Sequence, residues 1–420
     1  MYQNTFEPIA SCCRINFIQL PYKTTICIVV NCFFVAMWFT IFTAELTALF
    51  IVYAVILLLY RKWFLQLIPF AKPASIIPST TFSIIIPARN EALHIGNCLQ
   101  SIVEQNYPAD LVEIIVIDDH STDNTSQIVE QFRATHYNIK LIKLADELNG
   151  EILNSYKKKA IENAIGYATG NWIITTDADC IAKENWLANY DAWIQLQQPV
   201  FIAAPVAFTN NGTLLETFQY IDFMSLQGVT AASVHAGFHS MCNGANLAYR
   251  KDVFFEVNGF RGIDAIASGD DMLLMNKIKK QYPDKVSFLF TQEAIITTHP
   301  MPSWNNFFNQ RIRWASKAEQ FKSKDQKVFA VLVLVYLFNA ALFIMPLGIF
   351  ISIKILYLWL LFIGLKTLVE TAFAFPVARF FGQPFIWWFP FLQPLHIAYI
   401  VISGWLGKFG SYHWKGRNVK

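Results

Sequence analysis

Long apolar runs at both ends of the chain limit what it can fold into. Residues 24–60 contain one charged side chain, Glu45, and residues 328–369 are interrupted by only two lysines. A helix crosses the bilayer core with about 20 predominantly apolar residues, so the first run accommodates one or two spans and the second run two. Residues 385–406 contain no Asp, Glu, Lys or Arg. We therefore predict an integral, multi-pass membrane protein.

These runs divide the chain into four parts. We expect an N-terminal membrane segment over 1–68, a polar domain over 80–325, C-terminal membrane segments over 328–407 and a basic tail over 408–420. The polar block is large enough for one globular domain. The prolines between residues 69 and 80 indicate a linker into it.

Basic residues predict the orientation. Arg61 and Lys62 follow the first apolar run, and cytoplasmic flanks of membrane helices are enriched in Lys and Arg. We therefore expect the polar domain in the cytosol and the protein in the inner or plasma membrane, with the basic tail near anionic lipid head groups. Three spans after this domain would leave the tail outside, whereas two or four would return it. A re-entrant or interfacial piece at residues 383–394 would also resolve this conflict. Met37 is an alternative first residue.

Cysteine spacing and charge exclude some functions. None of the seven cysteines forms a CxxC pair, so the sequence predicts no zinc site and is consistent with a reducing compartment. The net charge of +3 and the lack of a basic stretch interleaved with aromatic residues argue against nucleic-acid binding.

Strand and helix patterns alternate in the polar domain, which predicts an α/β fold with a mostly parallel sheet and helices on both faces. Short apolar segments predict four strands, and amphipathic segments predict the helices between them. The predicted strands are 81–87, 112–118, 139–144 and 171–177, and the predicted helices include 92–105 and 154–168.

Polar side chains follow three of these strands. Ligands bind beyond the carboxyl ends of the strands in such sheets, so these residues are expected to line one crevice. Neither GxGxxG nor GxxxxGK follows any of the strands, which argues against a dehydrogenase or a P-loop ATPase. The residues are Pro87, Ala88, Arg89, Asn90, Glu91, Asp118, Asp119, Asp177 and Asp179.

Asp177 and Asp179 form an Asp-x-Asp at the end of a buried strand. Two adjacent carboxylates need a cation nearby, and carboxylate oxygens suit Mg²⁺ or Mn²⁺ completed by phosphate oxygens. A surface turn with Asp179 as a helix N-cap is the alternative. Cys180 is not expected to be a ligand, because these hard cations disfavour thiolate.

Two further groups are candidates for ligand binding. Asp118 or Asp119 could accept hydrogen bonds from a base or a ribose, although helix capping is the alternative. Lys157 begins a predicted helix and could reach a diphosphate, although a solvated lysine run is the alternative.

Six motifs follow one another in order along the polar domain: FSIIIPARNEALHIGNCLQSI, VEIIVIDDHSTDNT, KKKAIENAIGYATGNWIITTDAD, NGANLAYRKDVFFEVNGF, SGDDMLL and QRIRW. These ordered motifs resemble family 2 glycosyltransferases with a GT-A fold. The resemblance covers about residues 80–320 and is to the membrane-bound branch, which includes cellulose, chitin and hyaluronan synthases and ceramide glucosyltransferase.

The resemblance implies roles for individual residues. Pro87 to Glu91 and Asp118 or Asp119 would line the nucleotide pocket with Lys157 nearby, and Asp177 and Asp179 would bind the metal on the sugar diphosphate. Gly269–Asp271 stands where the family shows a catalytic acidic motif. Asp270 stands where this motif usually has Glu, and Leu273 stands where it has a later acidic residue. The base is expected to be Asp271, with Asp270 as the alternate.

QRIRW matches the QxxRW of the membrane-bound branch. On a helix, Gln310 and Arg313 share one face. Arg313 offers a planar fork for phosphate oxygens and Trp314 an aromatic platform for the acceptor. The surrounding segment is also typical of an interfacial helix beside the membrane.

Together these features predict an integral-membrane, metal-dependent, inverting glycosyltransferase. It would transfer a sugar from a nucleotide-sugar donor to a lipid-linked or polysaccharide acceptor at the cytosolic membrane face. A processive polysaccharide synthase shares every motif, but few spans are predicted for a channel. A catalytically idle scaffold that binds nucleotide sugar is the third hypothesis, and the retained Asp177, Asp179, Asp271 and Arg313 argue against it.

Overall fold

The structure, a computed structural model, describes residues 22–148, 155–264, 266, 269–382, 384–410, 412–414 and 417–419. Cys12, Cys13 and part of the predicted basic tail lie outside the described residues. The chain divides into two compact units, Met1–Ile51 and Val52–Lys420. Every site discussed below lies in the second unit.

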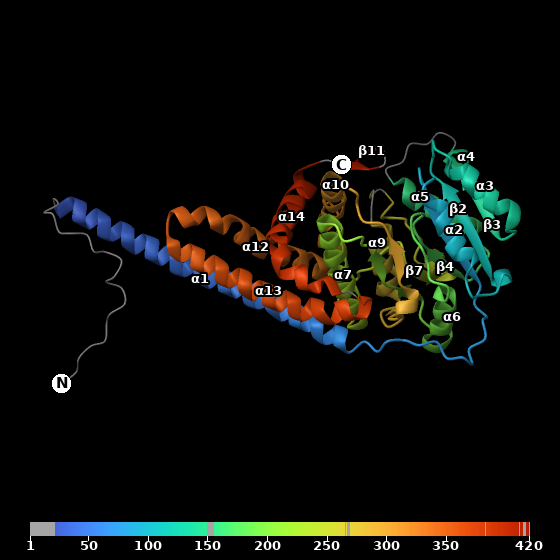
Figure 1. The fold of residues 1–420 in the computed structure, drawn as a ribbon, viewed down its shortest axis with the longest axis horizontal. Helices are drawn as coiled ribbons and strands as arrows, with labels where there is room; N and C mark the ends of the chain where they lie inside the picture. Colours follow the sequence, from blue (N-terminus) through green and yellow to red (C-terminus); the bar gives the residue numbers. More distant parts are fainter. Residues whose placement is uncertain are drawn as a thin grey trace. The chain divides into compact units, whose positions relative to one another are not determined.

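A seven-stranded sheet forms the centre of the second unit, with the order β3-β2-β1-β4-β7-β5-β8 (Figure 1). Neighbouring strands are parallel except where they pair with β7, which confirms the predicted mostly parallel sheet. The strands are β1 (Phe82–Ala88), β2 (Val112–Asp118), β3 (Ile139–Lys143), β4 (Trp172–Thr175), β5 (Phe201–Ala203), β7 (Leu247–Arg250) and β8 (Val286–Phe288).

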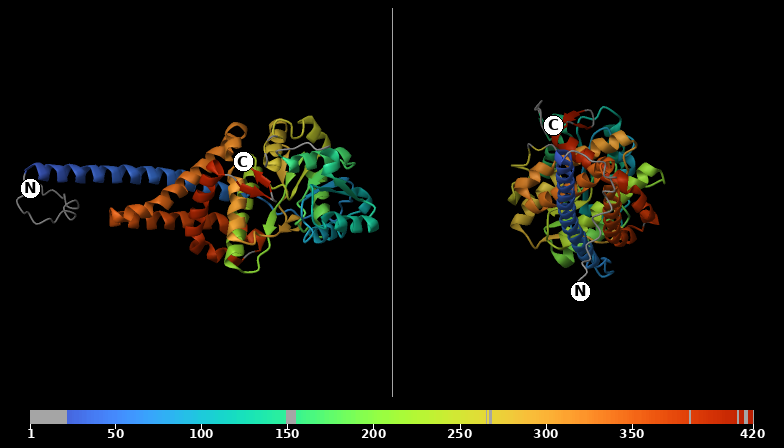
Figure 2. Two further views of the ribbon diagram at one scale, coloured as in Figure 1. Left: turned by 90° about the horizontal axis from the view of Figure 1, so that it is seen from above. Right: turned by 90° about the vertical axis from the view of Figure 1, so that its left-hand side faces the viewer.

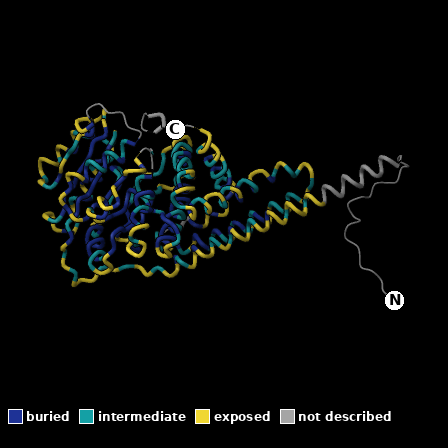
Figure 3. Tube along the Cα trace, turned by 180° about the vertical axis from the view of Figure 1, so that it is seen from behind, coloured by how far each residue is buried: buried dark blue, intermediate teal, exposed yellow. Residues whose placement is uncertain are grey.

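Burial explains why the central strands form. Every residue of β2 and β4 is buried, and so is all of β1 except Pro87; the tube coloured by burial shows the same concentration of buried residues in the sheet (Figure 3). Strands of a parallel sheet are covered on both faces and therefore consist of continuous apolar runs.

Helices flank the sheet as predicted. α2 (Ile95–Val103) buries residues spaced three and four apart, and it packs beside α3 (Thr125–Thr135). α5 (Tyr156–Tyr167) returns the chain from β3 to β4 and packs on β1 and β2. Right-handed crossovers place α5 on the face opposite α2 and α3.

Some predicted boundaries were wrong by a few residues. The helix expected from residue 92 begins at Ile95, because the Glu91 carbonyl accepts hydrogen bonds from the backbone N–H groups of both His94 and Ile95 in a preceding turn. The third strand ends before Leu144, which begins α4 (Leu144–Leu148), and the fourth ends at Thr175.

A small second sheet joins the loop that follows β4. β6 pairs with β9, and Ile181 forms a bridge to Thr297 of β9. The other elements of this domain are η2 (Ala109–Leu111), α6 (Trp186–Gln197), β6 (Val206–Phe208), α7 (Leu214–His235), α8 (Lys251–Glu256), α9 (Asp270–Gln281), η3 (Gln292–Ala294), β9 (Ile296–Thr298), α10 (Trp304–Ala315) and α11 (Ala318–Lys324).

Four helices in the described part of the chain are long and apolar enough to cross a membrane. The N-terminal run forms one continuous helix, so the alternative of two spans there is wrong. α12 and α13 leave the same side of the α/β domain (Figures 1 and 2). The helices are α1 (Tyr22–Leu65), α12 (Gln326–Ile344), α13 (Ile353–Phe381) and α14 (Phe389–Phe409), with η4 (Met345–Phe350) and η5 (Pro384–Trp388) between them.

α14 packs against the α/β domain near both of its ends. The short helix η5 before it contacts α7. At the other end, Lys408 forms a 3.7 Å ion pair with Glu319 of α11. The chain continues into the antiparallel strands β10 (Tyr412–Trp414) and β11 (Arg417–Val419), and β10 lies beside α10. The last apolar run therefore begins and ends beside the domain.

Candidate active site

Asp177 and Asp179 lie immediately beyond the carboxyl end of β4, and both are half-buried. Thr175 anchors this strand end, because its Oγ1 donates a 2.8 Å hydrogen bond to the Gly244 carbonyl. No helix begins at Asp179, since the next one, α6, begins at Trp186. The alternative of a simple N-cap at Asp179 is therefore wrong.

Lys157 links two motifs that are far apart in the sequence. Its Nζ donates a 2.7 Å hydrogen bond to Oδ1 of Asp177 and lies 3.7 Å from Oδ2 of Asp270. The lysine extends from the first turn of α5, and Asp270 from the first turn of α9. Lys157 thus lies between two carboxylates, which argues against the alternative of a solvated lysine run at this position.

The acidic pair Asp270 and Asp271 occupies the N-terminal turn of α9. Gly269 precedes the helix with φ +78°, a left-handed conformation that glycine adopts without strain. Asp271 accepts hydrogen bonds from the Gly244 N–H at 3.0 Å and from the Met272 N–H at 2.7 Å. Carboxylates at a helix N-terminus are stabilised by the helix dipole, so capping and catalysis are compatible here.

Opposite charges dominate the electrostatics around Lys157 and Asp270. Burial alone would lower the pKa of Lys157, but Asp177 and Asp270 hold it above its usual value. Burial would raise the pKa of Asp270, yet Lys157, Lys317 and Lys158 lower it. Asp270 is therefore ionised and Lys157 protonated at neutral pH.

The loops after β1 and β2 are joined by reciprocal hydrogen bonds. The Asn90 N–H donates to Ser121 Oγ at 3.0 Å, and Asn90 Oδ1 accepts from the Thr122 N–H at 2.8 Å. The Glu91 N–H donates to Thr125 Oγ1 at 2.8 Å. Asn90 and Glu91 therefore tie the loop after β1 to the loop after β2.

Asp118 and Asp119 differ in their environments. Asp118 accepts hydrogen bonds from the Ser121 N–H at 2.9 Å and from Ser126 Oγ, so both of its oxygens hold the local turn. Asp119 lies near the Arg89 guanidinium at 3.8 Å and His120 Nδ1 at 2.9 Å. Of the two, Asp119 is the one that lies beside charged or ionisable side chains. Pro87 and Ala88 form the end of β1, and the Ala88 carbonyl accepts from the Asp119 N–H.

The QxxRW residues lie on α10. Oε1 of Gln310 is buried without a hydrogen-bond partner among the described residues. Arg313 is close enough to Lys317 to lower the pKa of that lysine. The Arg311 guanidinium stacks on Trp314, with its Cζ 4.2 Å from the centroid of the Trp314 ring. The centroids of the Trp314 and Phe223 rings are 6.1 Å apart. One face of the Trp314 ring is thus packed against the protein.

Two residues beside these acids were not identified from the sequence. A Cβ added to Gly244 would lie 3.4 Å from Asp270 Oδ2 and 3.7 Å from Lys157 Nζ, so this glycine adjoins both groups. Burial lowers the pKa of Lys317 against the opposing effects of Asp271 and Asp270. Its position four residues after Arg313, just beyond the end of α10, is the signal that could have revealed it.

The donor set at the end of β4 fits a hard divalent cation. Asp177 and Asp179 offer carboxylate oxygens, and no group of three or more His, Cys, Asp or Glu side chains suited to a metal occurs among the described residues. Magnesium-type sites use one or two carboxylates and take their other ligands from phosphate and water. Burial raises the pKa of the neighbouring Cys180 thiol well above its usual value.

Comparison with known proteins identifies the family. Residues 83–255 match the model described as Glycosyl transferase family 2, and residues 172–401 match Glycosyl transferase family group 2. Glycosyltransferase AglE of Haloferax volcanii is 28% identical over 233 residues, which cover 55% of this chain and 70% of AglE. The probable glycosyltransferase YdaM of Bacillus subtilis is 27% identical over 238 residues, 56% of this chain and 54% of YdaM. The match therefore spans about half of YdaM.

A solved structure has the same fold. The mannosyltransferase PcManGT from Pyrobaculum calidifontis, in complex with GDP-Man and Mn²⁺, aligns with a TM-score of 0.56 at 19% sequence identity. The alignment covers 87% of this chain and 98% of PcManGT. The second family match includes more than half of the 420 residues. This chain therefore belongs to glycosyl transferase family group 2 and has a GT-A fold.

Proposed function

We propose that the protein is an integral-membrane, metal-dependent glycosyltransferase that moves a sugar from a nucleotide-sugar donor to a lipid-linked acceptor with inversion of configuration. The observation that carries the proposal is the contact of Lys157 with both Asp177 and Asp270. It unites the predicted donor-binding motif at the end of β4 with the predicted catalytic motif at the start of α9.

In the proposed reaction, Asp271 takes the proton of the acceptor hydroxyl as its oxygen attacks the anomeric carbon. The bond from that carbon to the diphosphate oxygen breaks, and the nucleoside diphosphate leaves. Each oxygen of Asp271 accepts one backbone hydrogen bond and keeps a further lone pair for the acceptor. Attack from the face opposite the leaving group inverts the configuration.

The other residues bind and orient the donor. Asp177 and Asp179 would hold a divalent cation, which when bound acts as a Lewis acid on the diphosphate oxygens. Lys157 and Arg313 supply positive charge near the diphosphate. Asp119, with Arg89 beside it, is proposed to contact the nucleoside.

The membrane helices support a lipid-linked acceptor. α10, which carries Gln310 and Arg313, packs along α14, and α11 leads directly into α12. The proposed site therefore adjoins the membrane segment, where the head group of an embedded acceptor can reach it. Because α14 begins and ends beside the domain, we propose that it lies along the membrane surface. The tail would then be on the cytosolic side with the domain, in agreement with the positive-inside rule.

A donor screen tests this function. Purified full-length protein in lipid nanodiscs is incubated with Mn²⁺, a lipid extract of its native membranes and each of several labelled UDP- and GDP-sugars. We expect one donor to release nucleoside diphosphate and to label the lipid fraction. Release and labelling that are absent with every donor, while the protein is folded, would contradict the proposal.

A further inference from the structure

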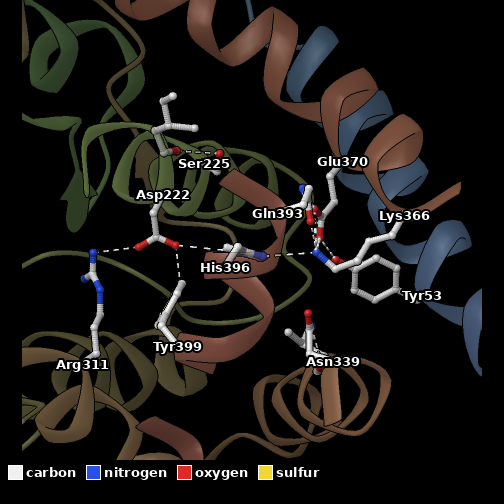
Figure 4. Close-up of polar contacts among 12 residues, drawn as sticks. Tyr53, Asp222, Ser225, Arg311, Asn339, Lys366, Glu370, Gln393, His396 and Tyr399 are labelled. Atoms are coloured by element: carbon white, nitrogen blue, oxygen red, sulfur yellow. Dashed lines mark hydrogen bonds and ion pairs between the residues drawn. The ribbon is translucent and has the colours of Figure 1, made fainter. Parts of the chain in front are cut away.

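A chain of buried and half-buried polar side chains connects the membrane helices to α10 (Figure 4). At one end, Lys366 of α13 is fully buried and forms a 2.7 Å ion pair with Glu370. Its Nζ also donates a 2.6 Å hydrogen bond to Gln393 Oε1 and lies 3.2 Å from Nδ1 of His396, both on α14. Tyr53 of α1 donates to Glu370. A buried charge is costly unless it is paired and hydrogen-bonded, as Lys366 is here.

The chain continues into the α/β domain at Asp222 of α7. His396 Nε2 lies 3.8 Å from Asp222 Oδ1, and the Tyr399 hydroxyl donates to the same oxygen. On its other side, Asp222 Oδ2 lies 2.7 Å from Nη2 of Arg311. Asp222 thereby joins α14 to α10, the helix that carries Gln310, Arg313 and Trp314.

Arg311 is poorly hydrogen-bonded for a buried cation. Its side chain is 3% exposed, and its contact with Asp222 lacks the alignment of a hydrogen bond, while Nε and Nη1 have no hydrogen-bond partner among the described residues. A buried ion pair with unsatisfied donors contributes little to stability and is often replaced by apolar side chains without loss. Stability alone therefore does not account for this pair.

The guanidinium is instead packed between aromatic rings. Its Cζ lies 4.2 Å from the Trp314 ring centroid, 4.9 Å from Phe307 and 6.0 Å from Tyr399. A flat cation stacked on one face of Trp314 fixes the orientation of that ring. Trp314 is the residue that we expect to face the acceptor.

We propose that Asp222 and Arg311 are positioning residues for glycosyl transfer: Asp222 holds the Arg311 guanidinium against Trp314, and His396 and Lys366 couple this arrangement to the membrane helices α14 and α13. The inference rests on the proposed function. Neither Asp222 nor Arg311 touches substrate, and both act through the Trp314 ring and the placement of α10.

The test removes both charges together, so that neither is left buried alone. In the full-length protein, Asp222→Leu is combined with Arg311→Met. We expect the variant to melt close to the wild-type temperature and to bind UDP or GDP with Mn²⁺ within twofold of the wild-type affinity. Transfer of the labelled sugar to the lipid extract should fall at least tenfold, with a higher KM for the extract and an unchanged KM for the donor.

A second variant keeps the proposal testable if the double variant does not fold. Arg311→Lys preserves the charge pair with Asp222 but replaces the flat guanidinium by a compact ammonium, and we expect the same change in acceptor KM. Asp191→Asn serves as a control, because Asp191 is a fully buried carboxylate on α6 that binds Thr80. It should lower the melting temperature and leave both KM values unchanged.

The outcomes separate this inference from the function on which it rests. A wild-type protein that transfers no sugar from any donor overturns both. An active wild type, together with a folded double variant or an Arg311→Lys variant that transfers at the wild-type rate, overturns the positioning role alone.

Discussion

The ammonium of Lys157 donates a 2.7 Å hydrogen bond to Oδ1 of Asp177. The Lys157 ammonium is thereby hydrogen-bonded to one of the two carboxylates that we propose as metal ligands. Binding of a metal and a diphosphate at this place requires the lysine to share Asp177 or to move toward the phosphate oxygens. The contact thus couples donor binding to the geometry of Asp270, which lies 3.7 Å from the same Nζ.

Replacement of Lys157 by Met tests this coupling. Loss of a charge-assisted hydrogen bond costs about 1.5–3 kcal/mol, so transfer should fall roughly 10- to 100-fold. Mn²⁺ should bind more tightly in the absence of donor, because Asp177 loses a competing cation. Calorimetry and the transfer assay measure the two effects. Lys159→Met is the control, since Lys159 pairs with Glu162 at the half-exposed surface of the same helix. Wild-type transfer by Lys157→Met would contradict the role.

Asp177→Asn and Asp179→Asn test the proposed metal site. A neutral amide binds a divalent cation weakly, and metal stabilisation of the leaving group contributes several kcal/mol, so transfer should fall about 100-fold or more. The Mn²⁺ concentration for half-maximal activity should rise in both variants. Treatment of the wild type with EDTA should abolish transfer, and added Mn²⁺ should restore it. Full activity in EDTA would show that the reaction needs no exchangeable metal. The exposed Glu184→Gln is the control.

Gly244→Ala tests how closely Asp270, Asp271 and Lys157 are packed around this glycine. The added Cβ would contact Asp270, Asp271 and Lys157 at ordinary van der Waals distances, so the fold should be retained while space between these groups is lost. Small misplacements at a reacting centre are costly, and we expect transfer to fall about 10- to 100-fold. Gly166→Ala is the matched control, because its Cβ would meet no atom within 4 Å. Equal rates for the two alanine variants would rule out a close fit at Gly244.

The ionisation of Glu113 of β2 should make the stability of the domain depend on pH. Burial would raise its pKa, but Lys140, Ser83 and Thr169 lower it to about 2. Because the folded pKa lies below the unfolded value, its stabilisation is complete above about pH 4.5 and is lost as the pH falls toward 2. The effect is roughly 3 kcal/mol.

Thermal melting of the full-length protein between pH 7 and pH 3 measures this dependence. Glu113→Gln should melt at a lower temperature at pH 7 and should lose less stability than the wild type below pH 4.5. Glu130→Gln, at an exposed ion pair with Arg133, should behave as the wild type. Parallel melting curves for Glu113→Gln and the wild type at all pH values would contradict the assignment.

The sequence predicted four of the seven strands of the sheet, and of these β1, β2 and β4 are continuous apolar runs with polar ends. It did not predict β5, β7 and β8. β2 has the predicted bounds, Val112–Asp118. The acids after β4 were selected as site residues because ligands bind beyond the carboxyl ends of the strands in such sheets. Helix and strand ends were less predictable, since local hydrogen bonds such as those to the Glu91 carbonyl decide them.

Contacts between distant elements could not be predicted from the sequence. The partners of Lys157 depend on how the first turns of α5 and α9 lie relative to Asp177 after β4, which no local pattern encodes. Lys366 interrupts an apolar run in the sequence, but its contacts with Glu370, Gln393 and His396 arise from the packing of α13 against α14. Hydropathy also describes α14 only as apolar and does not reveal that both of its ends lie beside the domain.

The most direct test of the account is the transfer rate of Asp271→Asn under saturating donor and Mn²⁺. Asparagine preserves the shape of the side chain but cannot take the proton of the acceptor hydroxyl, so transfer should fall about 10²- to 10⁴-fold. The affinity for the donor should stay within twofold of the wild type, and Asp270→Asn should retain more activity than Asp271→Asn. Transfer by Asp271→Asn at the wild-type rate would contradict the proposed catalytic base.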